Sequence, residues 1–298
     1  MMYTAYWAAV AASAALSLLA LRAGLRRAGF PQRTFACLAV LSVLLGALGA
    51  RAYYLLAHDV VRGFSGSLPA LLTAKPYELA MGGALLGVMA ALPVTARLTR
   101  CAAGPLADAL APAGLLMIAL SRAAECLADF GWGRVIGTEA LRRIPFGVQD
   151  AFGEWHCAVF WLEALCALGV LLAVLHRGEG RFSLALLMWA ATQIVCESLR
   201  AETLRWGFVR VQQVQCAVMM LCVLMLRTGR RRGHVPAGAW AAFAFGAAAV
   251  VLMEFALDKS DWPHVLCYAV MALASAAMAA AVHAARPGKG EVCARCGG

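Results

Sequence analysis

The sequence predicts an all-α integral membrane protein, a polytopic helix bundle, from two observations. First, 63% of the 298 residues are hydrophobic and only 14% are charged, whereas a soluble globular domain carries about 45–50% apolar and about 25% charged residues. Second, nine apolar runs approach the roughly 20 residues that cross a hydrocarbon core. This composition also excludes a disordered chain, a collagen and a small disulfide-rich secreted protein. The net charge of +10 does not form one face or stripe, so we expect no nucleic acid partner.

The nine apolar runs are the expected membrane-spanning helices. The first run lacks the basic n-region and the cleavage site of a secretory signal peptide, so we expect it to remain as a helix. The third and seventh runs are short, and each can gain a turn from its flank. The expected spans are roughly Tyr3–Leu21, Phe35–Leu56, Glu78–Val94, Leu106–Leu127, Trp155–Leu175, Phe182–Leu199, Val211–Leu226, Val235–Leu257 and Pro263–Ala285.

These runs divide the chain into three parts. Residues 1–228 hold seven helices, and residues 229–285 hold two more, rich in Ala and Met, which we expect to serve packing or oligomer contacts. Residues 286–298 form a tail in which Cys293 and Cys296 have C-x-x-C spacing. One such pair supplies two of the four ligands of a structural zinc site, and a second copy or His283 would have to complete it. A reduced tail in the cytosol is the simpler interpretation, so we predict no metal ion there.

The positive charges predict the orientation of the helices. Of the 26 Lys and Arg residues, 15 fall in alternate connections between the runs, beginning with the loop around Arg26 and Arg27 and ending with the C-terminal tail. Cytoplasmic loops carry this excess. We therefore expect a multi-pass protein of a bacterial-type cytoplasmic (inner) membrane, with the N-terminus outside and the C-terminus in the cytoplasm.

A group among the other 11 cations lies in or beside the outer ends of the apolar runs. An ionisable residue at membrane depth costs roughly 2.5–3.5 kcal/mol, so it usually faces a polar cavity or a partner. Several guanidinium groups together favour a phosphate ligand, although each can also be an Arg whose head extends to the interface. The residues are Arg51, Arg122, Arg134, Arg200, Arg205 and Arg210, accompanied by Glu125, Asp129, Glu197 and Glu202.

Two segments carry most of these charges. In residues 121–134, helical spacing places Arg122, Glu125 and Asp129 on one face. In residues 194–213, Glu197 and Arg200 are spaced i, i+3, and Arg205 and Arg210 follow. The two segments together make a two-sided phosphate clamp possible, and the polar segment 131–153 can cover it. We expect Gln213 to form a hydrogen bond between helices.

Small residues mark two further helices. Gly49 precedes Arg51 in the second run, and Gly82 and Gly83 begin the third run. Small residues at such positions allow close helix approach in membranes.

The order of these motifs resembles the prolipoprotein diacylglyceryl transferase family over about residues 5–226. The second run has Gly-Ala-Arg-x-x-Tyr, and the third has Gly-Gly-x-x-Gly. The family signature G-R-x-G-N-F-x-N-x-E-x-W-G-R is matched at Arg122, Trp132, Gly133 and Arg134. Farther on, Leu162-Glu163-Ala164 is similar to the family's Y-E-A, Glu197-Ser198-Leu199-Arg200 to its E-x-x-R, and Gln213 to the Gln that opens its last helix.

The resemblance implies transfer of the diacylglyceryl group from phosphatidylglycerol to the lipobox cysteine thiol of a prolipoprotein on the outer face. The implied partners are phosphatidylglycerol, other membrane lipid and prolipoprotein signal peptides, and no cofactor is implied. Arg122 and Arg200 would hold the phosphate, with Glu125 and Glu197 beside them in the catalytic set. The implied substrate-binding residues are Arg51, Gly82, Gly83, Gly133, Arg134, His156, Arg205, Arg210 and Gln213.

The sequence departs from the family pattern at positions that matter for the chemistry. Met81 stands where the family has a His before Gly-Gly, and a thioether transfers no proton. Within the signature, Glu125 replaces Asn and Phe130 replaces Glu. Either another group, such as Glu125, Glu197 or His156, activates the thiol, or the chain is a non-catalytic phospholipid-binding protein or transporter with the same fold.

Overall fold

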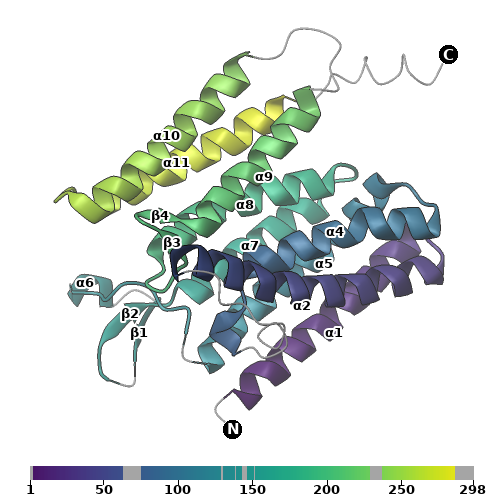
Figure 1. Ribbon diagram of the computed structural model, residues 1–298, viewed down its shortest axis with the longest axis horizontal. Helices are drawn as coiled ribbons and strands as arrows, with labels where there is room; N and C mark the ends of the chain where they lie inside the picture. The colour runs from purple at the N-terminus through teal and green to yellow at the C-terminus, as the bar shows by residue number, and fades with distance from the viewer. Residues whose placement is uncertain are drawn as a thin grey trace. The chain divides into compact units, whose positions relative to one another are not determined.

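The computed structural model describes residues 3–62, 75–128, 130–137, 139–142, 146–150, 152–228 and 237–285. The predicted Cys293 and Cys296 tail and Asp129 lie outside these residues. Nearly all regular structure within them is α-helical (Figure 1). The long helices are α1 (Thr4–Arg27), α2 (Gln32–Arg62), α4 (Met81–Thr99), α5 (Ala103–Ala124), α7 (Val159–Leu175), α8 (Arg181–Leu199), α9 (Val211–Thr228), α10 (Ala237–Lys259) and α11 (His264–Ala284). The short elements are η1 (Pro76–Glu78), η2 (Glu125–Leu127), α6 (Glu139–Arg142), β1 (Gly147–Gln149), β2 (Trp155–Cys157), β3 (Arg205–Trp206) and β4 (Val209–Arg210).

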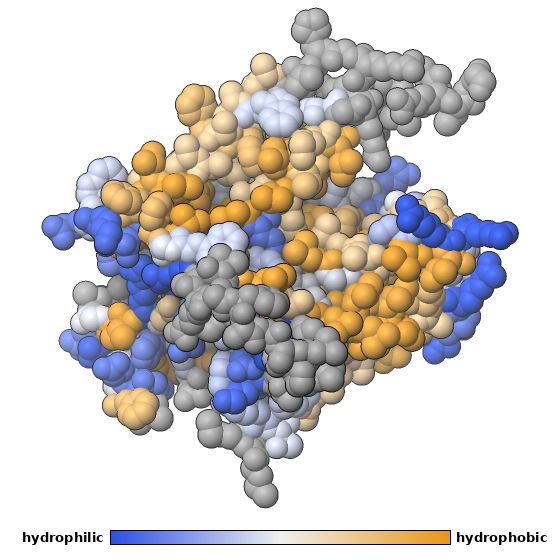
Figure 2. Space-filling model, viewed as in Figure 1, coloured by the Kyte–Doolittle hydropathy of each residue, from blue (hydrophilic) through white to orange (hydrophobic). Residues whose placement is uncertain are grey.

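Eight of the described helices are long and apolar enough to cross a membrane, which confirms the predicted fold class. The remaining long helix, α7, has 17 residues. Its predicted start at Trp155 is wrong because residues Trp155–Cys157 pair in a strand and the helix begins only at Val159. Large apolar side chains such as Leu98, Phe245 and Leu273 are exposed. Figure 2 shows such side chains spread over the visible sides of the helices, as expected where lipid replaces water.

One compact unit comprises residues 1–185 and 199–206. Its helices α1, α2, α4 and α5 enclose a core that includes Leu21, Leu38 and Leu106. The Asp108 carboxylate on α5 accepts hydrogen bonds from the backbone N–H groups of Gly180 at 2.8 Å and Phe182 at 2.9 Å. This carboxylate therefore satisfies donors at the start of α8 that have no partner within the helix.

Glycines let α2 and α4 approach closely, as the sequence predicted. A Cβ atom at Gly83 would lie 2.2 Å from the backbone oxygen of Gly49, and one at Gly87 would lie 1.9 Å from that of Leu45. Figure 1 shows the two helices side by side, and they make extensive contacts. Any larger residue at Gly83 would push the backbones apart.

The segment between α5 and α7 leaves the helical pattern. Strands β1 and β2 pair antiparallel, with Val148 opposite His156 and Gln149 opposite Trp155. Isolated bridges join Val135 to His156 and Gly133 to Arg200. These backbone pairs tie residues 133–135 to the segment before α7 and to the residue that follows α8.

The second compact unit comprises residues 186–198 and 207–298. Within its described part, α10 packs against α11, and a Cβ atom at Gly246 would lie 2.3 Å from Cγ of Met278. Arg227 near the end of α9 donates a hydrogen bond to the backbone oxygen of Val282 on α11. Helix α9 is therefore joined to α10 and α11 in one unit. The predicted boundary after residue 228 stays a prediction, since residues 229–236 lie outside the described ranges.

Candidate functional site

Two arginines and two glutamates from three helical regions meet in the first unit, and we call them the Arg122–Arg200 cluster. Arg122 lies in the last turn of α5, and Glu125 begins the 3₁₀ turn η2 that follows. Glu163 lies on α7, and Arg200 directly follows α8. The i, i+3 pairing of Arg122 with Glu125 is confirmed, whereas the helical face expected to continue to Asp129 ends with α5 at Ala124.

The four side chains form a closed ring in which cations and anions alternate. Arg122 contacts Glu125 Oε1 through Nη1 and Glu163 Oε2 through Nε, the latter at 2.9 Å. Arg200 Nη2 contacts Glu125 Oε2, and it lies 2.8 Å from Glu163 Oε2. Each carboxylate therefore binds both guanidinium groups. Charge-assisted bonds of this kind fix side-chain geometry more strongly than neutral ones.

The ring is buried and formally neutral. The side chains of Glu163 and Arg200 are 1% and 10% exposed, and those of Arg122 and Glu125 are 6% and 7% exposed. Burying a charge is costly unless a partner compensates it. Two positive and two negative groups compensate each other here, so an incoming anion would have to take the place of a carboxylate.

Glycines in the signature segment fit the backbone against this ring. Gly131 has φ +81°, and a Cβ atom there would lie 2.2 Å from Glu125 Oε2. At Gly133, a Cβ atom would lie 2.8 Å from Val159 Cγ2. The backbone N–H of Ala201 donates to the oxygen of Trp132 at 3.0 Å, and that of Gly133 donates to Cys157 at 2.7 Å. Gly131 thus lets the backbone pass close to the ring, and Gly133 lets it pack against Val159 and Cys157.

Arg51 has a separate carboxylate partner. Its Nη1 lies 2.9 Å from Glu78 Oε2, and its guanidinium carbon lies 5.7 Å from the ring centre of Tyr54. Glu78 belongs to η1, directly before α4. Gly82 and Gly83, which the resemblance placed in the substrate site, are buried on α4, and Gly83 meets α2. The described contacts of Gly83 are those of helix packing.

A second buried polar group, the Arg210–Glu254 cluster, lies in the second unit and consists of Arg210, Gln213 and Glu254. Arg210 Nε lies 3.4 Å from the Glu254 carboxylate, and Nη2 donates to the backbone oxygen of Ser198 at 3.1 Å. The Gln213 amide donates to Ile194 O at 2.9 Å and to Glu254 Oε1 at 2.6 Å. The prediction that Gln213 joins helices is confirmed.

The remaining predicted residues are more scattered. Glu197 is buried on α8, and Arg200 takes its ring contacts from Glu125 and Glu163. Arg205 is exposed and donates to Thr203 Oγ1 at 3.3 Å. Arg134 is half-buried, and its backbone oxygen accepts from Cys157 N at 3.4 Å. The described contacts therefore join Arg122 with Arg200 and Glu125, but do not bring Arg205 or Arg134 into the same ring.

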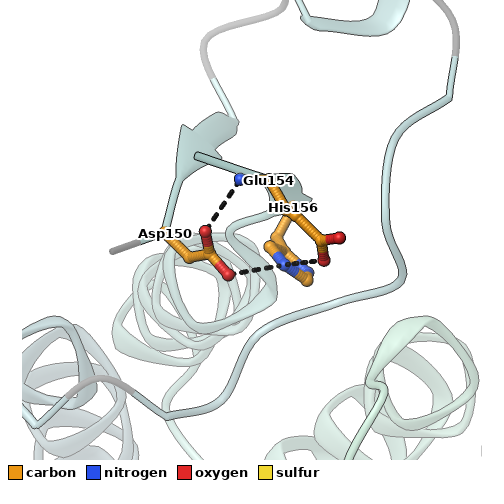
Figure 3. Close-up of side chains that lie close together, drawn as sticks. All are labelled: Asp150, Glu154 and His156. Carbon is orange, nitrogen blue, oxygen red and sulfur yellow. Dashed lines mark hydrogen bonds and ion pairs between the residues drawn. The ribbon is translucent and has the colours of Figure 1, made fainter. Parts of the chain in front are cut away.

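His156 has two carboxylate neighbours on its own hairpin (Figure 3). Its Nε2 lies 3.3 Å from Asp150 Oδ2 and 3.8 Å from Glu154 Oε2. Its Nδ1 lies 3.2 Å from the backbone oxygen of Gly133. The next residue, Cys157, is half-buried, and this burial raises the pKa of its thiol.

Four carboxylates were not singled out by the sequence reasoning as partners in these groups: Glu78, Asp150, Glu163 and Glu254. Glu163 had a signal, since it falls in the Leu-Glu-Ala motif inside an apolar run. Glu254 had a similar one, because a lone acid within a membrane span usually has a function or a partner. Such a signal does not identify the partner, which comes from another helix.

Comparison with known proteins agrees with the family resemblance of the sequence motifs. The sequence model of the family described as prolipoprotein diacylglyceryl transferase matches residues 2–228. The phosphatidylglycerol–prolipoprotein diacylglyceryl transferase of Bacillus cytotoxicus is 26% identical over 248 residues, which cover 78% of this chain and 90% of that protein. The protein of the same name from Shouchella clausii is 26% identical over 241 residues, or 76% and 86% of the two chains. The family match ends at the end of α9, so α10 and α11 lie beyond it.

Proposed function

Because this chain belongs to the prolipoprotein diacylglyceryl transferase family, we propose that it transfers the diacylglyceryl group of phosphatidylglycerol to the lipobox cysteine of a prolipoprotein. The observation that carries the proposal is the meeting of Arg122, from the signature, and Arg200, from the E-x-x-R motif, in one buried ring. Guanidinium groups match phosphate oxygens in pairs. Two of them held together make a site for the phosphate of a phospholipid headgroup.

The reaction is a displacement at a glyceryl carbon. The cysteine sulfur forms a bond to that carbon, and the carbon–oxygen bond to the phosphate breaks, so glycerol phosphate leaves with the electron pair. Negative charge on the leaving phosphate grows in the transition state. Fixed donors from Arg122 and Arg200 stabilise this charge, and they need no reorganisation at that moment.

The thiol proton needs an acceptor, and Glu125 is the one we propose. It contacts both arginines in the ring. At the start of α4, where the family has a His, this chain has Met81. When the substrate phosphate binds the guanidinium groups, it displaces Glu125 from them. The released carboxylate then takes the proton from the cysteine thiol as the sulfur attacks.

Several predicted residues support this site without entering the ring. Gly133 and Trp132 connect the signature segment to Arg200 and Ala201, so we assign Gly133 to positioning. Arg134, which follows Gly133, and Arg51 are kept as headgroup contacts. Arg205, Arg210 and Gln213 remain proposed substrate contacts only through the resemblance, and Glu197 remains the alternative base.

A second candidate function is phospholipid binding without transfer. Met81 and the full neutralisation of Arg122 and Arg200 by carboxylates favour it. Such a protein would bind phosphatidylglycerol and leave the lipobox cysteine unmodified.

We also propose that the protein is a multi-pass protein of the bacterial inner membrane with its N-terminus outside. The family and the eight apolar helices support the membrane assignment. The excess of cations in alternate connections supports the orientation, which places the ring near the outer face.

The test is expression of the full chain in bacteria depleted of their own transferase, with mass spectrometry of a reporter lipoprotein. Diacylglyceryl on the reporter cysteine is the expected result. If well-expressed protein leaves the cysteine unmodified, the transfer proposal is wrong. Binding of phosphatidylglycerol by that same protein would then support the second candidate function.

A further inference from the structure

A group of metal-ligating side chains lies outside the membrane-spanning helices, on the hairpin formed by β1 and β2. Asp150 follows β1, Glu154 precedes β2, and His156 lies within β2 (Figure 3). Each offers one ligand atom, and the three atoms lie within 4.8 Å of one another. The transfer reaction proposed above does not use this group.

The hydrogen bond of the imidazole determines which ring nitrogen faces the carboxylates. Nδ1 lies 3.2 Å from the Gly133 backbone oxygen, which can only accept a hydrogen bond, so Nδ1 carries a hydrogen. In neutral His156, Nε2 then presents a lone pair toward Asp150 and Glu154. Three electron-rich atoms facing each other repel unless a cation or a proton lies between them.

Asp150 is held in place by its own loop. Its Oδ1 accepts hydrogen bonds from the backbone N–H groups of Glu154 at 2.8 Å and Phe152 at 2.9 Å, which leaves Oδ2 facing His156. These two hydrogen bonds hold the carboxylate with its second oxygen directed at the imidazole.

The two distances from the imidazole to the carboxylates fit a small divalent ion. Nitrogen and oxygen ligands lie about 2.0–2.2 Å from Zn²⁺, so two ligands of a tetrahedral ion lie roughly 3.4 Å apart. The distances from His156 Nε2 to Asp150 and Glu154 are 3.3 and 3.8 Å. A hydrogen bond from the second ring nitrogen to a carbonyl, as found here to Gly133, is also typical of a metal-binding histidine.

We propose that Asp150, Glu154 and His156 bind a divalent metal ion of the zinc class. One imidazole and two carboxylates supply three ligands, and water completes the coordination. Glu154, whose side chain is 62% exposed, closes on the ion by a side-chain rotation.

The metal ion would stabilise the segment that carries the signature glycine. His156 is bridged to Val135 and bonded to Gly133, and Gly133 is bridged in turn to Arg200. An ion that joins three points of the hairpin would therefore restrict the motion of residues 133–135 beside the Arg122–Arg200 cluster. The metal proposal does not rest on the transfer reaction, and binding can be measured without any substrate.

The test is a Zn²⁺ titration of the purified full chain in detergent, after treatment with a chelator, using a competing Zn²⁺ indicator. Cys293→Ser and Cys296→Ser are introduced in every sample, because the tail pair can also bind zinc. About one equivalent of Zn²⁺ should bind. Asp150→Asn, Glu154→Gln and His156→Gln should each weaken that binding at least ~tenfold.

His176→Gln is the matched control. His176 also bonds through Nδ1 to a backbone oxygen, that of Leu172 at 2.7 Å, but no carboxylate of the described residues contacts its ring. Its variant should bind Zn²⁺ as the parent does, and X-ray absorption of the bound zinc should show nitrogen and oxygen ligands only. Absence of binding by the parent, or unchanged affinity in the Glu154→Gln variant, would overturn the proposal. Glu154 is the most exposed of the three ligands, so misfolding does not obscure that result.

Discussion

The two buried charge clusters of this protein differ in how their arginines are neutralised. In the Arg122–Arg200 cluster, two arginines share two carboxylates, and every member lies in the part matched by the family. In the Arg210–Glu254 cluster, one arginine and the Gln213 amide both contact the Glu254 carboxylate of α10, beyond that part. Backbone oxygens of Ser198 and Ile194 accept further hydrogen bonds.

This difference indicates different uses of buried charge. A ring with two guanidinium groups can exchange one carboxylate for a phosphate and remain compensated. In the second cluster, the Glu254 carboxylate contacts both Arg210 and Gln213, so an anion that displaced it would break both of these contacts. We therefore interpret the first cluster as a site for an anion and the second as a link between α8, α9 and α10.

The largest effect is expected from removing an arginine of the ring. Arg122→Ala and Arg200→Ala should each lower transfer at least ~100-fold, as loss of a fixed transition-state donor does in other enzymes. Diacylglyceryl incorporation into a reporter lipoprotein measures this. Arg27→Ala, in the exposed end of α1, should leave incorporation unchanged.

Arg122→Lys and Arg200→Lys distinguish an effect on phosphate binding from an effect on folding. Each keeps the charge that the carboxylates require but loses the paired donors of guanidinium. We expect protein of normal yield with strongly reduced transfer. Full activity in either Lys variant would contradict paired binding of phosphate at that position.

Replacement of Glu254 in the second cluster should lower the stability of the protein and not act directly on transfer. Glu254→Ala should lower the free energy of unfolding by about 3–5 kcal/mol, because a buried charge loses its compensating partner. Thermal unfolding of the purified protein measures it. Asp258→Asn, at the exposed pair with Lys259, should change stability by less than about 0.5 kcal/mol.

Gly131 offers a smaller and more local perturbation of the ring. Its φ is +81°, and a Cβ atom would meet Glu125 at 2.2 Å. Gly207 also has a positive φ, +66°, but its Cβ would meet nothing within 4 Å. Both Gly→Ala variants carry a backbone cost of roughly 1–2 kcal/mol, so the difference between them reports on the ring.

We expect Gly131→Ala to reduce transfer clearly more than Gly207→Ala does, at matched protein levels. The reporter lipoprotein measures both. Equal losses in the two variants would mean that contact between residue 131 and Glu125 has no part in the reaction.

The smallest effect is expected at Glu125, a charged residue at a position where the family signature has Asn. Glu125→Asn removes one anion from between two arginines, so phosphatidylglycerol should bind about tenfold more tightly, because a charge-assisted hydrogen bond is worth ~1.5–3 kcal/mol. If Glu125 also accepts the thiol proton, kcat should fall in the same variant while KM falls. An unchanged KM would show that Glu125 does not compete with the phosphate.

The sequence predicted some parts of the site because they depend on local spacing. Arg122 and Glu125 pair because they are three residues apart at a helix end, and Gly49 and Gly83 allow close packing because they lack a side chain. The membrane fold followed from the length and composition of the apolar runs. Each of these inferences needs only neighbouring residues.

Other parts depend on contacts between distant segments. Glu163 lies 37 residues from Arg200, and Glu254 lies 44 residues from Arg210. Helical periodicity places each of them on an element but does not identify the helix it faces. The hairpin of β1 and β2 brings two carboxylates next to His156. A helix was expected to start at Trp155, but residues Trp155–Cys157 pair with β1 in this hairpin.

The most direct test of the central claim uses the purified chain in nanodiscs that contain phosphatidylglycerol with a labelled glycerol headgroup. A peptide with a lipobox cysteine is added, and released glycerol phosphate and peptide mass are followed together. We predict release of labelled glycerol phosphate with an equal amount of diacylglyceryl-modified peptide, and strongly reduced amounts of both products with Arg122→Lys. Binding of the labelled lipid with no release and no modified peptide would contradict the assignment of this chain as a transferase.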